Sequence, residues 1–277
     1  MSQYVQTSGN GKIKVTKLNR RSLTTRSTIL FLMLFTIVGF LLLDYKGVDF
    51  KVAIPTTIEN LKQMFLLPQL SSTTFTEAFI QVMKTVSLAF LSTILGAVIS
   101  LFLALGAAKN LSNQWISNCI KVFIAVIRAV PTVLWVLIFA ISAGLGSVAA
   151  VIGMMFHSIA YLVKAYSEAF EEVDNDTIEA LKASGANGWH IVFSAVIPST
   201  LSYLISWTFL RFEINFGVAV AMGAAAGAGG IGYELFMASA FYFDLNEVGM
   251  ITYMVLVVAF ILELISTRLK NVGMIRG

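Results

Sequence analysis

Charged and amide side chains interrupt the longest apolar stretches of this 277-residue sequence, and these are the residues that could act on a polar species in apolar surroundings. Arg211 lies near the middle of the stretch 199–224, with Glu213 two positions on and Asn215 one helical turn on. Arg128 lies in the stretch 119–142. A charge at the centre of a membrane-spanning helix costs about 2.5–3.5 kcal/mol on insertion scales, so each charge needs a partner or a role.

Two interpretations account for these charges. In the first they form structural ion pairs between helices. Arg211 and Glu213 point to different sides of a helix, which leaves Arg128 as a candidate partner of Glu213. In the second, Arg211 and Arg128 line a path for an anion, and Asn215 orients it. The balance of charge mildly favours an anion, because bases outnumber acids among the ionisable residues inside the apolar stretches: Lys84, Arg128, Arg211, Glu213 and Glu263.

Other kinds of chemistry find little support in the sequence. A metal site needs three or four converging ligands, whereas His157 and His190 stand apart from each other and from Cys119. The glycines of the segment 227–232 formally satisfy a dinucleotide-binding fingerprint, but they lack the strand that must precede it. No phosphate-binding Gly-x4-Gly-Lys-Ser/Thr motif and no catalytic triad or paired carboxylates occur. We therefore expect no catalytic residue, metal or cofactor in this chain, and a tight or re-entrant turn at the glycines.

The composition places these residues in a membrane protein. Hydrophobic residues make up 57% of the chain and charged residues only 12%, against about 25% charged in soluble domains. The mean hydropathy is +0.83, and the single cysteine excludes an intrachain disulfide framework. We predict an all-α polytopic membrane protein, with a kink at Pro131 in the third span. Six segments reach the length of about 20 residues that a membrane span requires: 27–45, 78–107, 119–142, 146–166, 199–224 and 247–267.

The distribution of basic residues predicts the orientation. Residues 1–27 contain six Lys or Arg and no acid, and no signal-peptide cleavage site follows the first apolar stretch. With both termini in the cytoplasm, 13 of the 19 Lys and Arg lie on the inner side and three on the outer side. We accordingly divide the chain into a cytoplasmic basic arm (1–27), a first membrane helix (28–45), an external loop (46–76) and a transmembrane domain (77–270).

Two smaller features concern packing. Small residues recur every four positions along the second span, a pattern that lets another helix approach closely: Ser92, Gly96, Ser100, Ala104 and Ala108. Within the external loop, Ile58–Leu67 could form a short helix on the outer surface.

The inner connection 167–198 predicts a short helix that lies across the membrane axis. Asp176 can cap this helix with Glu179 in its first turn, and Gly185 can end it. A second amphipathic turn then leads to Pro198. The amphipathicity of this segment alone is explained by a solvated loop helix. The alternative is a helix on which another protein docks.

The spacing within this connection is similar to that of a known family. Glu179-Ala180, Gly185 six residues later and Ile197-Pro198 resemble the docking loop of ABC importer permeases. Leu181, Ala195 and Ile197 depart conservatively from its pattern. The segments 210–215 and 227–235, together with 128–131 and 144–146, are similar to signatures of the phosphonate-type permeases. The resemblance covers residues 75–275.

This resemblance implies a membrane subunit of a bacterial ABC importer, in the cytoplasmic membrane, that moves a phosphonate or phosphite. It implies a second copy of the chain, an extracytoplasmic solute-binding protein, and ATPase subunits that bind ATP and Mg²⁺. No nucleic acid partner is expected, and lipid surrounds the spans. Docking of the ATPase is expected at Glu179, Ala180, Gly185, Ile197 and Pro198. The translocation path or gate is expected at Arg128, Pro131, Arg211, Glu213, Asn215, Gly229, Gly230 and Gly232.

Two alternatives stay open at this point. The chain could be an ABC permease for a different small solute, because fold-level likeness does not fix a binding site. It could also be an ATP-independent secondary carrier or channel. The exact substrate, the identity of the partners, and the choice between a homodimer and a paralogous pair are not given by the sequence.

Overall fold

The computed structural model describes residues 6–7, 13–14, 20–44 and 47–275, which divide into two units, 1–57 and 58–277. In the first unit, β1 (Gln6–Thr7) pairs antiparallel with β2 (Ile13–Lys14), and α1 (Arg20–Leu42) follows. The segment Ser22–Leu42 of α1 is long and apolar enough to cross a membrane. Most of the predicted basic arm, with Lys46 and Arg276, lies outside the described residues.

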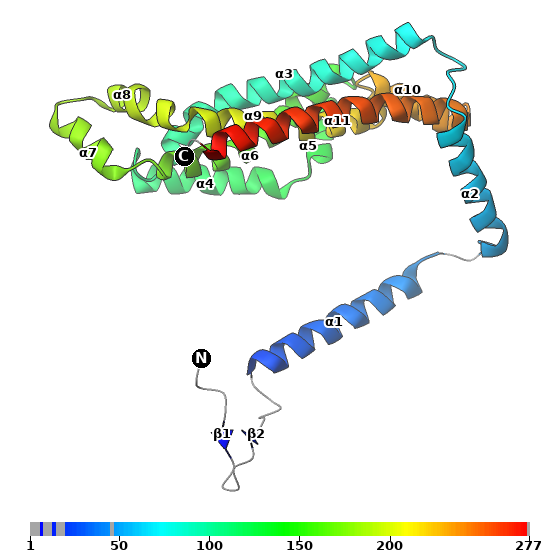
Figure 1. Cartoon of the computed structure of the whole chain (residues 1–277), viewed down its shortest axis with the longest axis horizontal. Coiled ribbons are helices and arrows are strands. Elements are labelled where there is room, and N and C mark those ends of the chain that lie inside the picture. Colours follow the sequence, from blue (N-terminus) through cyan, green and yellow to red (C-terminus); the bar gives the residue numbers. More distant parts are fainter. Residues whose placement is uncertain (1–5, 8–12, 15–19, 45–46, 276–277) are drawn as a thin grey trace. The chain divides into compact units, whose positions relative to one another are not determined.

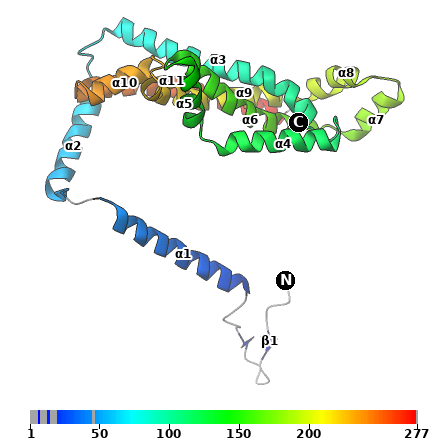
Figure 2. The same cartoon turned by 180° about the vertical axis from the view of Figure 1, so that it is seen from behind.

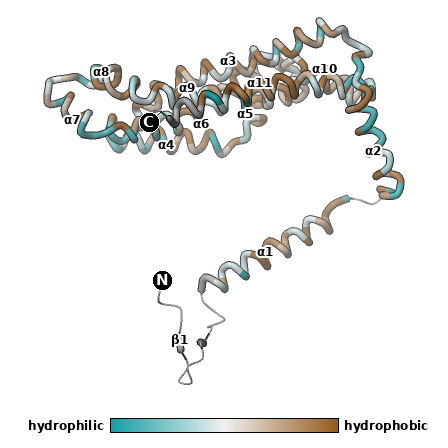
Figure 3. Tube along the Cα trace, in the orientation of Figure 1, coloured by the Kyte–Doolittle hydropathy of each residue, from teal (hydrophilic) through white to brown (hydrophobic). Residues whose placement is uncertain are grey.

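The second unit is a helical bundle that begins within α2 (Phe50–Leu66). It comprises the long helices of Figure 1, seen from behind in Figure 2: α3 (Phe75–Ala107), α4 (Gln114–Ala129), α5 (Thr132–Ala143), α6 (Ser147–Glu171), α9 (Ile197–Ala225) and α11 (Leu245–Ile275). The short helices α7 (Asn175–Ala183) and α8 (Gly188–Ile191) lie at one end of the bundle, and α10 (Ile231–Ala240) lies at the other. Hydrophobic colours dominate α3 and α11 in Figure 3, and hydrophilic colours gather on α7.

Tight packing of α3 on α6 confirms the seam of small residues. A Cβ atom on Gly96 would lie 3.0 Å from the Cβ of Ser158, and the Ser100 hydroxyl donates a hydrogen bond to the Ile159 carbonyl at 3.1 Å. Thr74 and Glu77 cap the start of α3 reciprocally. Such close approach lets polar groups of the two helices meet without intervening side chains.

The third predicted span, 119–142, is not one continuous helix. Among the described residues, five helices can each cross a membrane, and α4 with α5 can form a sixth span that is bent by 89°. The break falls at Val130 and Pro131, where the residue before proline adopts an extended conformation and proline itself cannot donate a backbone hydrogen bond. The Trp135 indole donates to the Ile127 carbonyl across the bend at 3.0 Å. The predicted kink is therefore confirmed, and the chain is an all-α multi-pass membrane protein.

The connection 167–198 forms α7 (Asn175–Ala183), α8 (Gly188–Ile191) and a wide π-type turn, Val192–Val196. The helix cap is Asp174, whose carboxylate accepts from the Asp176 amide at 3.2 Å; the prediction of Asp176 as the cap was wrong. Val173, the residue before this cap, is partly buried against the core.

Gly185 ends α7 as predicted. Its φ is +85°, its amide donates to the Lys182 carbonyl at 3.0 Å, and the Ala186 amide donates to the Leu181 carbonyl at 3.0 Å. These two bonds satisfy the last carbonyls of the helix. Pro198 then lacks an amide to donate, and the Ile197 amide reaches back to Val192 in the wide turn.

The glycine segment makes the predicted tight turn at the far end of the bundle. Gly227, Gly229 and Gly230 have φ values of +59°, +75° and +74°, and α10 (Ile231–Ala240) then folds back along α9. A Cβ on Gly232 would lie 1.8 Å from the Val220 carbonyl oxygen, so only glycine permits this contact.

The loop before α3 is attached to the start of α11. Helix α2 begins earlier than the predicted Ile58, and its last turn accepts a hydrogen bond from the Tyr253 hydroxyl at the Phe65 carbonyl, 2.8 Å. The carboxylate of Glu247 is buried and accepts from the hydroxyls of Ser72 and Thr73 at 2.8 and 3.1 Å.

Candidate functional site

The central charge of the bundle belongs to Arg211, which is only 3% exposed on α9. Its Nε donates to the Ser158 hydroxyl of α6 at 3.0 Å, and its guanidinium carbon lies 5.3 Å from the ring centroid of Tyr161. No carboxylate of the described residues lies within ion-pair distance of it. A hydroxyl and the face of an aromatic ring therefore hold the cation in place of an acid.

Asn215 extends this polar cluster by one helical turn. It is fully buried, and its amide nitrogen donates to the hydroxyls of Thr93 and Ser158, each at 2.8 Å. Its Oδ1 and the Nη2 of Arg211 are both buried with no hydrogen-bond partner among the described residues. Buried polar groups are almost always hydrogen-bonded. The cluster therefore has unused donor and acceptor capacity in the interior of the helical bundle.

The cluster continues along facing stripes of two helices. On α6, Ser158, Tyr161, Ala165 and Glu168 follow one another at intervals of three or four residues and share a face. On α9, Trp207 and Arg211 are one turn apart, and the rings of Trp207 and Tyr161 lie 5.8 Å apart between centroids. Polar and aromatic groups thus run from the buried centre toward the end that carries α7.

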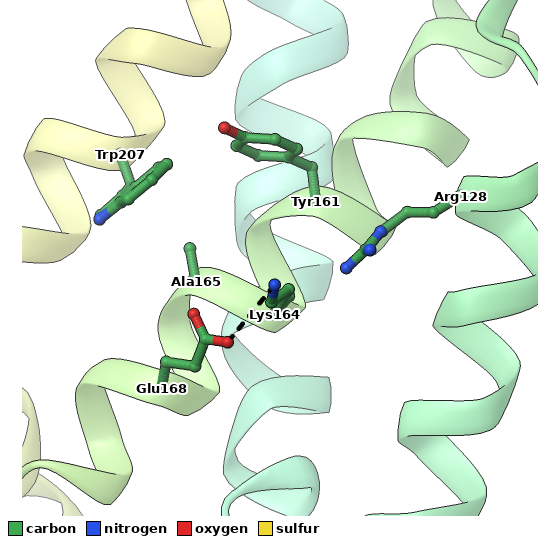
Figure 4. Close-up of a pocket in the computed structure, with 6 residues that line it drawn as sticks. All are labelled: Arg128, Tyr161, Lys164, Ala165, Glu168 and Trp207. Carbon is green, nitrogen blue, oxygen red and sulfur yellow. Dashed lines mark ion pairs between the residues drawn. The ribbon is translucent and has the colours of Figure 1, made fainter. Parts of the chain in front are cut away.

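Beside Tyr161 the structure has a cavity of about 220 Å³ (Figure 4). Arg128 reaches it from α4, Trp207 lines it from α9, and α6 supplies the other walls. Within it the Lys164 ammonium lies 3.6 Å from the Glu168 carboxylate, both groups being more than half exposed. Arg128 forms no ion pair with the described residues. The six residues that line the cavity are Arg128, Tyr161, Lys164, Ala165, Glu168 and Trp207.

The remaining predicted path residues do not converge on one place. Arg211 and Asn215 share the buried cluster, whereas Arg128 lies in the neighbouring cavity and Pro131 at the bend. Glu213 is half-buried and forms no ion pair with Arg128. The three glycines lie in the turn and α10 at the opposite end of the bundle: Gly229, Gly230 and Gly232.

The predicted docking residues lie together at the other end. Glu179 and Ala180 are exposed on α7, Gly185 ends that helix, and Ile197 and Pro198 begin α9 after the wide turn. Ile178, 2% exposed, fixes α7 to the core beside Phe170 and Ile191. Within the described ranges no three His, Cys, Asp or Glu gather as a metal site would require.

Sequence reasoning missed the neutral groups of the site. Ser158 and Tyr161 were not predicted as site residues, although their spacing on one helix face could have indicated a polar stripe. Ser92 was recognised only as part of the packing seam, yet its hydroxyl lies 3.4 Å from the Asn215 amide nitrogen. Lys164 and Glu168 belong to the cavity only because α4 and α9 approach them.

A second group of ionisable residues lies near α10. Asp244 accepts hydrogen bonds from the amides of Asn246 and Glu247, each at 3.0 Å, and the Glu247 amide together with the Ser71 side chain lowers the pKa of Asp244 below its ordinary value. Burial, followed by the neighbouring Glu247 carboxylate, raises the pKa of Glu234. These groups face the start of α11 and lie apart from Arg211.

Comparison with known proteins finds a family whose match lies within the helical bundle. Residues 96–271 match the family model described as "Binding-protein-dependent transport system inner membrane component". The phosphite transport system permease protein PtxC of Stutzerimonas stutzeri is 30% identical over 68% of this chain and 68% of its own length. The phosphate-import permease protein PhnE of Mycolicibacterium smegmatis is 29% identical over 70% of this chain, which spans about a third (36%) of that protein.

The fold is also found in solved structures. A chain of the MetNI methionine ABC transporter, in inward-facing conformations, superposes with a TM-score of 0.65 at 19% identity, covering 74% of this chain and 99% of the other. A chain of a bacterial ABC transporter involved in the import of alginate gives a TM-score of 0.56 at 15% identity, covering 89% and 96%. These likenesses show the fold of the helical bundle.

Proposed function

This chain belongs to the binding-protein-dependent transport system inner membrane components, and from that membership we propose that it is the permease through which an ABC importer moves a phosphonate or phosphite. The names of its relatives, one a phosphite permease and one a phosphate-import permease, support a phosphorus oxyanion as the substrate. The chain itself is a non-catalytic membrane subunit, and ATP with Mg²⁺ is hydrolysed by a partner.

The buried guanidinium of Arg211 carries this proposal. It has no carboxylate partner among the described residues, and its Nη2 is unpartnered. An isolated buried charge is unfavourable by several kcal/mol unless an opposite charge compensates it. An oxyanion supplies that charge and accepts parallel hydrogen bonds from the planar guanidinium. Arg211 with Asn215 is therefore the point in the path where the anion is stabilised inside the membrane.

The distribution of the basic residues supports an orientation with both termini and the α7 end in the cytoplasm. ATPase subunits dock on Glu179–Pro198 at this end, and the extracytoplasmic binding protein delivers the anion near α10. A second copy of the chain completes the path. The location is the cytoplasmic membrane of a bacterium.

The coupling residues are mechanically linked to the anion site. Docking forces on α7 pass through the buried Ile178 to the inner ends of α6 and α9. These two helices hold Ser158 and Arg211, whose hydrogen bond joins them. A change in the relative position of the two helices alters the hydrogen bonds that protein groups make with Arg211. It thereby alters the affinity of Arg211 for the anion.

Uptake in a strain that lacks the native gene tests the proposal. Labelled methylphosphonate and phosphite are offered to phosphate-starved cells that carry wild type, Arg211→Gln or the exposed-site control Arg268→Gln. We expect Arg211→Gln to reduce uptake about tenfold or more at equal protein level. The reason is that a hydrogen bond to a charged group contributes about 1.5–3 kcal/mol. Uptake that is equal in all three strains would remove Arg211 from the path.

A further inference from the structure

The cavity beside Tyr161 is distinct from the buried Arg211 cluster. We propose that it is a second binding station, here called the inner station, which holds an organophosphonate on its way to the cytoplasm. This inference rests on the proposed function and deepens it. The inner station comprises Arg128, Tyr161, Lys164, Glu168 and Trp207.

Charge is the first argument for the inner station. Arg128 extends from the last turn of α4 toward the cavity in Figure 4 and has no acidic partner among the described residues. The Lys164–Glu168 pair is long at 3.6 Å and largely exposed, so it is weak and exchangeable. The cavity therefore offers the guanidinium of Arg128, which has no ion pair among the described residues, and the ammonium of Lys164. An incoming oxyanion can replace Glu168 as the partner of Lys164.

Shape and surface decide the kind of oxyanion. The cavity has room for several water-sized groups, because its volume of about 220 Å³ far exceeds the roughly 10–15 Å³ that one water needs, and a bare phosphite does not fill it. Two aromatic side chains, Tyr161 and Trp207, form walls of the cavity from different helices. An inorganic oxyanion gains no apolar contact from aromatic walls, whereas a carbon substituent packs on them. The inner station thus favours a phosphonate with a carbon–phosphorus bond.

Position links the inner station to Arg211. The ring of Tyr161 contacts the Arg211 guanidinium and also lines the cavity. Along α6 the stripe runs ten residue steps from Ser158 to Glu168, a rise of about 15 Å. An anion that leaves Arg211 passes Tyr161 and meets Arg128 without crossing an apolar stretch. Glu168 then competes for Lys164 and promotes release toward the cytoplasm.

Equilibrium binding of labelled methylphosphonate to the purified complete transporter tests this inference. The transporter is held in nanodiscs of phosphatidylcholine, and the Arg211→Gln background leaves only the inner station. In that background we expect Arg128→Gln to weaken binding about tenfold or more, as for one lost charge-assisted bond. Glu168→Gln should tighten it severalfold, because Lys164 loses its competitor, while the control Arg268→Gln should change nothing.

Three outcomes would overturn the inner station. One is binding in which Arg128→Gln and Glu168→Gln both behave like Arg268→Gln. Another is phosphite binding as tight as methylphosphonate binding, since the aromatic walls would then contribute nothing. The third is the absence of any binding in the Arg211→Gln background. Each can occur while wild type still takes up methylphosphonate in cells, so failure of the inner station is separable from failure of the proposed function.

An anionic lipid headgroup presents the same phosphate chemistry, and a second nanodisc composition distinguishes it. With phosphatidylglycerol present, we expect methylphosphonate binding to persist and no lipid to be retained through Arg128. If the lipid abolishes methylphosphonate binding, and native mass spectrometry finds it on wild type but not on Arg128→Gln, the cavity is a lipid site and the inference fails.

Discussion

The hydroxyl of Ser158 on α6 accepts a hydrogen bond from Nε of Arg211 on α9 at a distance of 3.0 Å. The same oxygen accepts from the Asn215 amide at 2.8 Å and donates to the Met154 carbonyl at 2.7 Å. Its hydrogen-bonding capacity is therefore fully used. Ser158 orients both polar residues of α9 from a position 53 residues away from Arg211 in the chain.

Replacing Ser158 should separate the effect of orienting Arg211 and Asn215 from the effect of the Arg211 charge itself. Ser158→Ala keeps Arg211 but removes the acceptor that aims it and Asn215, so we expect uptake of labelled phosphonate to fall severalfold at normal protein level. Ser87→Ala is the matched control, because Ser87 also donates to a carbonyl four residues back, at 2.8 Å, but is exposed and has no hydrogen bond to a site residue among the described residues. Equal uptake by the two variants would show that Ser158 has no part in positioning.

The glycine that ends α7 tests dependence on an ATPase. Gly185 has φ +85°, where any other residue is strained by about 1–2 kcal/mol, and Gly185→Trp adds bulk to the proposed docking surface. In proteoliposomes with the complete transporter, we expect ATP-driven uptake to fall more than tenfold. Uptake that survives this change, and that proceeds without ATP, would favour a secondary carrier instead.

The turn before α10 offers a test of stability. Gly230 has φ +74°, and a Cβ on it would lie 2.3 Å from the Thr85 hydroxyl, which accepts the Ile231 amide at 3.0 Å. Gly230→Ala should therefore cost about 1–3 kcal/mol of unfolding free energy and lower the thermal midpoint in detergent.

Gly217→Ala is the control for this turn. Gly217 lies within α9 and would bring its Cβ within 4 Å of nothing, so alanine should be neutral or slightly stabilising there. Equal midpoints for the two variants would contradict the geometry described for the turn.

The Asp244 carboxylate predicts a pH dependence at the start of α11. Its pKa in the folded protein lies below the ordinary value of 3.8, because it accepts backbone hydrogen bonds there. Such a group stabilises the fold above the unfolded pKa, and this contribution is lost as the pH falls through the folded pKa. The stability difference between wild type and Asp244→Asn should thus be largest near neutral pH and should shrink below about pH 4. Thermal unfolding across this range measures it, and a difference that grows on acidification would reverse the assigned sign.

Much of the fold was predictable because hydropathy and backbone geometry act locally. Apolar length gives the spans, positive φ requires glycine at residues such as Gly185, and small residues mark the seam on α3. The 89° angle at Pro131 was not predictable in the same way. A proline specifies that a helix is interrupted, whereas the direction of the next helix depends on what α5 packs against.

The site was harder to predict for a related reason. Spacing shows that Arg211 and Asn215 share a face of α9, but it does not show that a serine of α6 and a threonine of α3 meet them. The start of α7 makes the same point on a small scale. Asp174 and Asp176 are equally good caps by residue type, but only Asp174 directly follows a residue, Val173, that packs against the core.

The bend at Pro131 also has a consequence for hydration. Helix α5 has 12 residues and a rise of about 18 Å, too short to cross a hydrocarbon layer of about 30 Å. A membrane span built from α4 and α5 together therefore turns within the hydrocarbon layer, and Pro131 at the turn is exposed in the described chain. Bare backbone cannot face lipid tails, so protein or water must cover this point. Arg128 lies three residues before this point, so whatever covers the bend, protein or water, also meets a positive charge.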